Sequence, residues 1–497
     1  MPEALRSVLA TSIAALTLLV MGPLSVVHAG NDEDSDEPGS LARIEHLVVI
    51  YQENRSFDNL YGTFPGANGL KRASNVAKTQ VDLAGNPFKC LQQTDPQLTS
   101  PPLPADVCST LKGDPFNSHF ANQPFNIDDF VPAKLKTRDL VHRFYQELVQ
   151  IDGGKMDKFV VVSDAKGLAM GVYRTANLPV AAEAARFVVA DNFFHAAFGG
   201  SFLNHAWLVC ACTPIFTGAV RDGGPNDLHT VLGTDGLPQP GKDRPLTVAS
   251  EGDFAVNTIF STSPPLPAGT PDARRLPNQM MPTIGDELSG AGISWAWYAG
   301  GWNDAVAGKP HPLFQFHHQP FNYFANYAPG QPGRAHLKDE SDFIAAAQGG
   351  NLPAVSFVKP LGPDNEHPGY TDLITGQQHV EDLINAVRHG PNWHNTAIVI
   401  TYDENGGYWD QVAPPTSPRH ADQWGPGTRV PTIVVSPLAK RHFVDHTLYD
   451  TTSILATIEH RWHLRPLGTR DAHANDLRKA FSAGGDRERD DNDEGEG

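Results

Sequence analysis

Residues 397–407 read Ala-Ile-Val-Ile-Thr-Tyr-Asp-Glu-Asn-Gly-Gly, an apolar, β-branched run that ends abruptly in two carboxylates. Short runs of this kind, bounded by turn residues, predict buried strands of an α/β sheet. Residues 46–58 repeat the design, because His-Leu-Val-Val-Ile-Tyr precedes Gln-Glu-Asn-Arg-Ser-Phe-Asp. Ligands of open α/β sheets bind just beyond the carboxyl ends of the strands. We therefore expect one edge of the sheet to carry four polar side chains, which are Glu53, Asn54, Asp403 and Glu404.

These four side chains offer the oxygen atoms that hard divalent cations prefer as ligands. Strand ends are often polar, so either pair taken alone could equally be a solvated loop. Together the two pairs predict a site for one divalent metal ion. The sequence does not identify the ion, because oxygen ligands with nearby imidazole suit several metals.

The rest of the chain alternates strand patterns with helix patterns. Strands are expected at residues 187–191, 293–298, 354–358 and 430–436, and helices at 136–149, 179–186, 201–209, 282–288, 379–388 and 451–462. This alternation predicts an α/β fold with a mainly parallel central sheet covered by helices on both faces. Stretches at 66–129 and 221–279, with many turn-forming residues, are expected to be irregular insertions on the ligand-binding edge.

Both ends of the chain are expected to lie outside this fold. A basic residue, an apolar stretch at 12–20 and small residues at 27–29 have the order of a secretory signal peptide, predicted to cover residues 1–29. The mature protein would then be secreted or periplasmic, and retention of this segment as a membrane anchor is the alternative. Residues 481–497 form an acidic run that predicts a disordered tail. One domain remains, at residues 30–480.

Composition excludes one class of partner and permits disulfides. The chain has 56 Asp and Glu against 38 Lys and Arg, a formal net charge of −18. Nucleic acids are bound through clustered Lys and Arg, so we expect no nucleic-acid partner. In an exported chain, Cys90 and Cys108 could close a proline-rich loop, while Cys210 and Cys212 could pair locally or stay reduced.

Ser201 is the candidate nucleophile. Gly199 and Gly200 precede it and allow close backbone approach, and a serine that opens a helix lies where free N–H groups stabilise an anion. An ordinary helix cap would also place a serine there. Serine needs activation by a base or a metal, and the chain has no G-x-S-x-G motif. The predicted metal site is therefore the favoured activator.

Four histidines lie in loops or near strand ends that would place them at the same edge: His142, His317, His318 and His367. Any one alone could be a surface or core histidine. As a group they could bind phosphate as imidazolium, protonate a leaving alkoxide or ligate a metal. Imidazolium donors would favour activity at mildly acidic pH. We expect the histidines without such context either to be structural or to support the residues that touch the ligand; they are His195, His205, His379, His446 and His460.

Seven motifs, in order, resemble the bacterial phosphoesterase family that unites secreted acid phosphatases with phospholipases C, a relative of the alkaline phosphatase superfamily. The motifs are residues 53–58, the segment around His142, and residues 153–157, 200–205, 317–323, 364–370 and 402–407. The resemblance covers nearly the whole mature chain. It implies an alkaline-phosphatase-like, three-layer catalytic domain with loop-rich insertions on the ligand-binding rim.

The resemblance also implies roles for individual residues. The metal ion would be bound by Glu53, Asn54, Asp403 and Glu404 together with Ser201. The phosphate would be surrounded by His142, His317, His318 and His367. Catalysis would pass through a phosphoserine on Ser201.

Two segments are similar to the acid-phosphatase branch: Gly-Gly-Ser-Phe-Leu-Asn-His, which contains Ser201, and His-His-Gln-Pro-Phe-Asn-Tyr, which begins at His317. Phospholipases C of the family typically have threonine in place of the serine. We therefore expect a metal-dependent acid phosphatase that hydrolyses small phosphomonoesters. The alternative is a phospholipase C that cleaves phosphatidylcholine-type diesters. A secreted protein that captures phosphate or phospholipid headgroups without turnover would not need a poised serine and several histidines.

Overall fold

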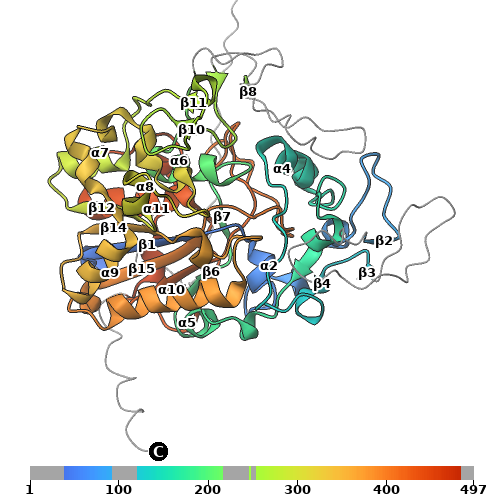
Figure 1. The fold of residues 1–497 in the computed structure, drawn as a ribbon. Helices are drawn as coiled ribbons and strands as arrows, with labels where there is room; N and C mark the ends of the chain where they lie inside the picture. Colours follow the sequence, from blue (N-terminus) through green and yellow to red (C-terminus); the bar gives the residue numbers. More distant parts are fainter. Residues whose placement is uncertain (1–38, 92–119, 217–245, 248–252, 483–497) are drawn as a thin grey trace, which may run out of the picture. The chain divides into compact units, whose positions relative to one another are not determined.

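The computed structural model describes residues 39–91, 120–216, 246–247 and 253–482 (Figure 1). An eight-stranded sheet lies at its centre, in the order β13-β12-β14-β1-β15-β16-β6-β17. The strands are β1 (His46–Gln52), β6 (Val188–Ala190), β12 (Trp295–Ala299), β13 (Leu337–Asp339), β14 (Val355–Lys359), β15 (Thr396–Tyr402), β16 (Thr432–Val435) and β17 (Phe443–Asp445). Only β16 runs antiparallel to its neighbours within this sheet. The predicted α/β class with a mainly parallel sheet is confirmed.

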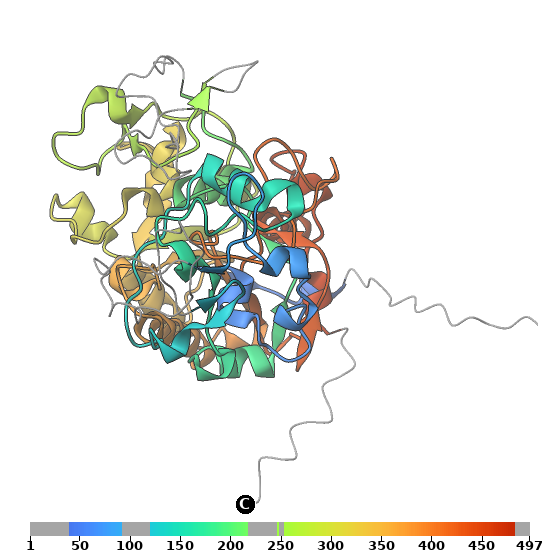
Figure 2. The same ribbon diagram turned by 90° about the vertical axis from the view of Figure 1, so that its right-hand side faces the viewer.

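Helices cover both faces of the sheet, which gives three layers (Figures 1 and 2). One face carries α5 (Ala181–Arg186), α9 (Glu340–Gln348) and α10 (Leu373–Arg388); the other carries α6 (Ser201–Cys210), α7 (Ile284–Gly290) and α11 (Thr451–Trp462). Helix α10 begins at Leu373 rather than at His379, because the Asp372 side chain accepts a hydrogen bond from the Thr375 N–H and caps the helix there.

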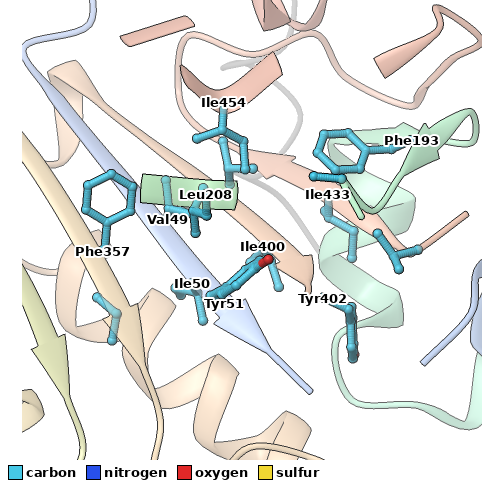
Figure 3. Close-up of a cluster of buried hydrophobic side chains, with 14 of the residues drawn as sticks. Val49, Ile50, Tyr51, Phe193, Leu208, Phe357, Ile400, Tyr402, Ile433 and Ile454 are labelled. Carbon is cyan, nitrogen blue, oxygen red and sulfur yellow. The ribbon is translucent and has the colours of Figure 1, made fainter. Parts of the chain in front are cut away.

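The core lies between the sheet and these helices. Figure 3 shows Val49 of β1 and Phe357 of β14 in one buried cluster with Leu208 of α6 and Ile454 of α11. All four side chains are buried. Burial of each stabilises the fold by roughly 2 kcal/mol. This packing fixes α6 over the strands that end at the polar edge.

The helix predicted at residues 136–149 is wrong over its first half. Helix α4 covers Phe144–Ile151, and the preceding segment runs without helix. The apolar spacing in this segment resembles a helix, but tertiary bonds hold the backbone in a non-helical conformation. The Arg138 guanidinium lies 2.6 Å from Asp164 Oδ2, and the Val141 N–H donates to Asp164 Oδ1 at 2.9 Å. This non-helical segment brings His142 to the polar edge, where its Nε2 lies 3.2 Å from Asn54 Nδ2.

Besides short 3₁₀ turns, the described part of the chain also contains shorter helices and strands. They are α1 (Gly39–Ala42), α2 (Phe57–Tyr61), α3 (Asn75–Lys78), α8 (Trp302–Val306), β2 (Cys90–Leu91), β3 (Phe120–Ala121), β4 (Phe125–Asn126), β5 (Gly171–Val172), β7 (Phe193–Phe194), β8 (Leu246–Thr247), β9 (Asp253–Phe254), β10 (Phe260–Ser261), β11 (Arg275–Leu276) and β18 (Tyr449–Asp450). Where it is described, the stretch at 66–129 contains only short elements, which are α3, β2, β3, β4 and two 3₁₀ turns, joined by irregular segments. Within the second insertion, 221–279, residues 221–245 and 248–252 lie outside the described residues.

Cys210 and Cys212 form a disulfide, which decides between the two alternatives left open for them. Cys90 is also disulfide-bonded, and Cys108 lies outside the described residues. The predicted signal peptide also lies outside them. Phe481 is buried and the Ser482 N–H donates to the Leu438 carbonyl, so the described fold continues to residue 482 and the rest of the predicted tail lies beyond it. No described helix is long and apolar enough to cross a membrane.

Candidate active site

The register of two parallel strands builds the polar edge. Gln52 at the end of β1 pairs with Tyr402 at the end of β15, so the residues that follow leave the sheet side by side. The Asn54 N–H donates to Asp403 Oδ1 at 3.1 Å. Gly406 has a φ of 61°, and a Cβ there would lie 2.3 Å from the Asn54 carbonyl oxygen. The glycine after the carboxylates is therefore required for the two turns to pack together.

Ser201 is the first residue of α6 and does not cap it. Gly200 is the N-cap, and no side chain caps the helix. The Ser201 hydroxyl instead lies 3.3 Å from Glu53 Oε2 and 3.3 Å from Asn54 Oδ1. The helix-cap explanation for this serine is therefore wrong, and its oxygen faces the predicted metal ligands.

A buried glutamate holds the loop before Ser201. Glu147 Oε2 accepts a hydrogen bond from the Gly199 N–H at 2.6 Å, and Glu147 Oε1 lies 2.9 Å from His195 Nε2. Oε1 also accepts from the Thr428 N–H at 2.9 Å. Gly199 itself has a φ of 87°, and a Cβ would lie 2.3 Å from the Phe144 backbone nitrogen. The sequence pattern did not single out Glu147.

Three carboxylates are fully buried at this edge. Burial, and then the Glu53 carboxylate, raises the pKa of Asp403 well above its ordinary value; burial, and then Asp403, does the same for Glu404. Burial also acts to raise the pKa of Glu53, but Lys359 and His318 outweigh it and hold that pKa well below its ordinary value. Among the described residues, Asp403 Oδ2 and Glu404 Oε1 have no hydrogen-bond partner. Buried, unpartnered carboxylate oxygens beside a serine and an amide oxygen fit a divalent cation.

Backbone carbonyls determine which nitrogen of several histidine rings faces the site. Nδ1 of His142 lies 2.5 Å from the Leu140 carbonyl oxygen, and Nδ1 of His367 lies 2.6 Å from that of Pro368. A ring nitrogen that faces a carbonyl carries the proton, so each Nε2 is the bare nitrogen. His142 Nε2 lies 3.2 Å from Asn54 Nδ2, and His367 Nε2 lies 3.9 Å from Glu53 Oε2.

His317 and His318 complete the set. His318 Nε2 lies 3.0 Å from Glu53 Oε1, and the His317 ring stands edge-on to the His318 ring at 4.7 Å. Burial lowers the pKa of all four predicted histidines. The rings are therefore neutral at neutral pH, unlike the imidazolium donors considered from the sequence. A bound phosphate would favour the protonated form again.

A cavity of about 580 Å³ opens beside these groups. Six predicted site residues line it: Glu53, His142, Ser201, His317, His318 and His367. Asn54, Asp403 and Glu404 lie buried behind that wall. The structure thus brings every predicted site residue to one place, with the serine between the carboxylates and the cavity.

A model of the Phosphoesterase family matches residues 44–465. The chain belongs to the Phosphoesterase family. Phospholipase C A of Mycobacterium tuberculosis is 26% identical over 90% of this chain and 78% of its own length. Non-hemolytic phospholipase C of Pseudomonas aeruginosa is 25% identical over 89% of this chain and 58% of its own length. Among solved structures, murine ectonucleotide pyrophosphatase/phosphodiesterase 5 aligns at 10% identity and a TM-score of 0.31, over 61% of this chain and 94% of that one.

Two further residues of this phosphoesterase lie in the site, although neither was predicted as a metal ligand or a catalytic residue. His205, expected to be structural or to support the site residues, stacks on the His318 ring at 5.2 Å, and its Nδ1 lies 2.7 Å from the Ser201 carbonyl oxygen. Its position four residues after Ser201, on the same helix face, was the available signal. Lys359 ends β14 and contacts the Glu53 carboxylate. The strand-end rule that found Glu53 would have found this lysine too.

Possible metal ligands form two groups among the described residues. Ligand atoms of Glu53, His205 and His318 lie within 4.8 Å of one another, and so do those of Asp139, His142 and His367. Both groups border the predicted oxygen ligands. The count and identity of bound ions therefore depend on which of these donors is used.

Proposed function

We propose that this chain hydrolyses phosphoric esters through a phosphoserine formed on Ser201. The observation that carries the proposal is the position of the Ser201 hydroxyl, 3.3 Å from both Glu53 Oε2 and Asn54 Oδ1, on the wall of a histidine-lined cavity. Membership of the Phosphoesterase family supports the same class of reaction.

The residues that would hold one divalent ion are Glu53, Asn54, Ser201, Asp403 and Glu404. Such an ion, when bound, lowers the pKa of a hydroxyl and polarises a phosphoryl oxygen. Asp403 Oδ2 and Glu404 Oε1 support this assignment, because they are buried and accept no hydrogen bond from the described part of the chain.

The chain's own residues would then carry the reaction. Ser201 reacts as the alkoxide after its proton has passed to water; its oxygen bonds to phosphorus while the bond to the ester oxygen breaks. A protonated ring, His318 or His367, gives its proton to the departing alcohol oxygen. The same ring then takes a proton from the water that attacks the phosphoserine, which releases phosphate and restores Ser201.

His142 and His317 would orient the phosphoryl group. His142 also fixes the Asn54 amide through Nε2, which leaves Asn54 Oδ1 free to face the serine. Free N–H groups at the start of α6 stabilise negative charge that develops on the phosphoryl oxygens. Positioning and charge stabilisation supply most of the acceleration in phosphoryl transfer.

Two substrate classes follow from different observations. The named relatives are phospholipases C, so they support cleavage of phospholipid diesters better than they support our sequence-based expectation of an acid phosphatase. Hydrolysis of phosphomonoesters is supported by Ser201 itself and by the local segments that resemble the acid-phosphatase branch. Both reactions use the same serine and differ in the group that stays on phosphorus.

One comparison separates the two classes. Purified enzyme is given p-nitrophenyl phosphate and, separately, phosphatidylcholine in mixed micelles, and kcat/KM is measured for release of nitrophenol and of phosphocholine. A tenfold or larger preference assigns the class. Turnover of neither compound, nor of a panel of other phosphoesters, by metal-loaded enzyme would contradict the proposed activity and favour a binding protein.

A further inference from the structure

Lys359 is a buried cation that the reaction proposed above does not use. It is fully buried at the end of β14, and it does not line the cavity. Its ammonium contacts Glu53 Oε1, lies 3.3 Å from the Gln52 carbonyl oxygen and stands 5.1 Å from the centre of the Tyr51 ring. Burial of an ammonium group costs folding free energy unless an opposite charge pairs with it. The Glu53 carboxylate is that opposite charge for Lys359.

The two carboxylate oxygens of Glu53 face different groups. Oε1 faces Lys359 and also His318 Nε2 at 3.0 Å. Oε2 faces the Ser201 hydroxyl at 3.3 Å and His367 Nε2 at 3.9 Å. The lysine therefore holds the carboxylate in the orientation that presents one oxygen to the serine.

The groups around Glu53 Oε1, the oxygen that faces Lys359, are also suited to bind a metal ion. Ligand atoms of Glu53, His205 and His318 lie within 4.8 Å of one another. The His205 Nδ1 proton is directed to the Ser201 carbonyl, so the buried Nε2 is a bare acceptor, and it has no hydrogen-bond partner among the described residues. Such a group would accept a metal ion if no other positive charge were present.

The charges of the buried groups also favour one divalent ion together with Lys359 rather than two divalent ions. The three carboxylates of Glu53, Asp403 and Glu404 carry three negative charges when ionised. One divalent ion and one ammonium neutralise them, whereas a second divalent ion beside Lys359 would leave an excess of positive charge in a buried site.

We propose that Lys359 is a built-in cation that occupies the Glu53–His205–His318 group, keeps a second metal ion out of it and leaves Glu53 Oε2 as the oxygen that faces Ser201. The proposal rests on the metal centre of the proposed function. Lys359 is a positioning residue, because it acts through Glu53 and does not border the substrate cavity.

The test measures bound zinc. Wild type, Lys359→Met, Lys359→Met/His205→Ala and the exposed control Lys338→Met are equilibrated with Zn²⁺. Stoichiometry is then read by mass spectrometry of the metal, and affinity by chelator competition. We expect one equivalent in wild type and in the control, two in Lys359→Met, and one again in the double variant. The kcat of Lys359→Met should fall roughly 10–100-fold with little change in KM.

A folded Lys359→Met variant that binds one equivalent with wild-type affinity would overturn the inference while leaving the metal centre intact. Zero equivalents in wild type would overturn the metal centre itself and the inference with it. If circular dichroism shows that Lys359→Met does not fold, the zinc stoichiometries of wild type and His205→Ala test the inference instead. The inference requires the same single equivalent in both, and a second wild-type ion that His205→Ala removes would refute it.

Discussion

Ser201 depends on neighbours that perform separate tasks. Gly199 and Gly200 let the loop pass close to residues 142–144, Glu147 ties that loop down, and Asn54 accepts from the hydroxyl. The residue types around the serine could be recognised from the sequence. Glu147 could not, because it lies in α4 with no local pattern that separates it from an ordinary helix glutamate.

Replacing Ser201 with alanine should lower kcat by at least about a thousandfold, since the proposed nucleophile is lost while the cavity remains. Initial rates on the better of the two substrates above give the value. Ser341→Ala, at an exposed position of helix α9, is the matched control and should keep wild-type rates. In rapidly quenched wild-type enzyme, phosphate should be found on the peptide that contains Ser201. Undiminished turnover by Ser201→Ala would remove this serine from the mechanism.

Elements position the site through strand register and helix packing. Strands β1 and β15 end at paired residues, so the turns that follow them bring Glu53 and Asp403 to the same place. The sequence predicted both strands because their apolar runs are short and sharply bounded. It failed over the first half of 136–149, where side-chain spacing predicted a helix and bonds to Asp164 hold a non-helical segment instead. Periodicity describes one element at a time and contains no information about such a distant partner.

Gly199→Ala tests the loop that enters α6. A Cβ there would meet the Phe144 backbone, and a φ of 87° already disfavours any side chain. Gly292→Ala is the matched control, because Gly292 also has a positive φ, 70°, but open space around it. The control should lose about 1 kcal/mol of unfolding free energy. Gly199→Ala should lose more and should also lower kcat, because Ser201 shifts.

Chemical denaturation and initial rates measure both variants. Equal stability losses in the two variants, with unchanged kcat in Gly199→Ala, would show that contact with residue 144 does not position the serine.

Across the whole molecule, buried charge makes stability depend on pH and metal. Glu366 is fully buried next to His367, and it accepts hydrogen bonds from the Tyr402 hydroxyl at 2.8 Å and the Gln377 amide at 3.1 Å. Burial raises the pKa of Glu366 from 4.5 to about 7. The folded protein therefore holds this proton more tightly than the unfolded chain does. The resulting stabilisation is complete below pH 4.5 and is lost as the pH rises through 7.

Glu366→Gln should remove that pH dependence. The glutamine keeps the shape and an acceptor oxygen but does not titrate, so its stability advantage over wild type should grow between pH 5 and 8. The shift corresponds to on the order of 3 kcal/mol. Melting temperatures of wild type, Glu366→Gln and the exposed control Glu45→Gln across this range provide the measurement. Parallel curves for wild type and Glu366→Gln would contradict the argument.

Removal of metal should lower both activity and melting temperature. Without a cation, Asp403 and Glu404 must be neutralised by protons inside the site, and an ion that binds only the folded state stabilises it by mass action. Dialysis against a chelator should abolish turnover, and addition of a divalent ion should restore it together with the melting temperature. Full activity in a sample shown to be metal-free would exclude the ion from the reaction.

The sequence by itself determined the α/β class, the main strands and the residue types gathered at one edge. These features are local, because apolar runs, turn residues and strand ends are contiguous in the chain. Only the tertiary structure decided that Ser201 faces Glu53 and Asn54, that His205 belongs to the site and that Lys359 pairs with Glu53. Those contacts join segments more than a hundred residues apart, and packing of α6 and β14 against β1 sets their distances.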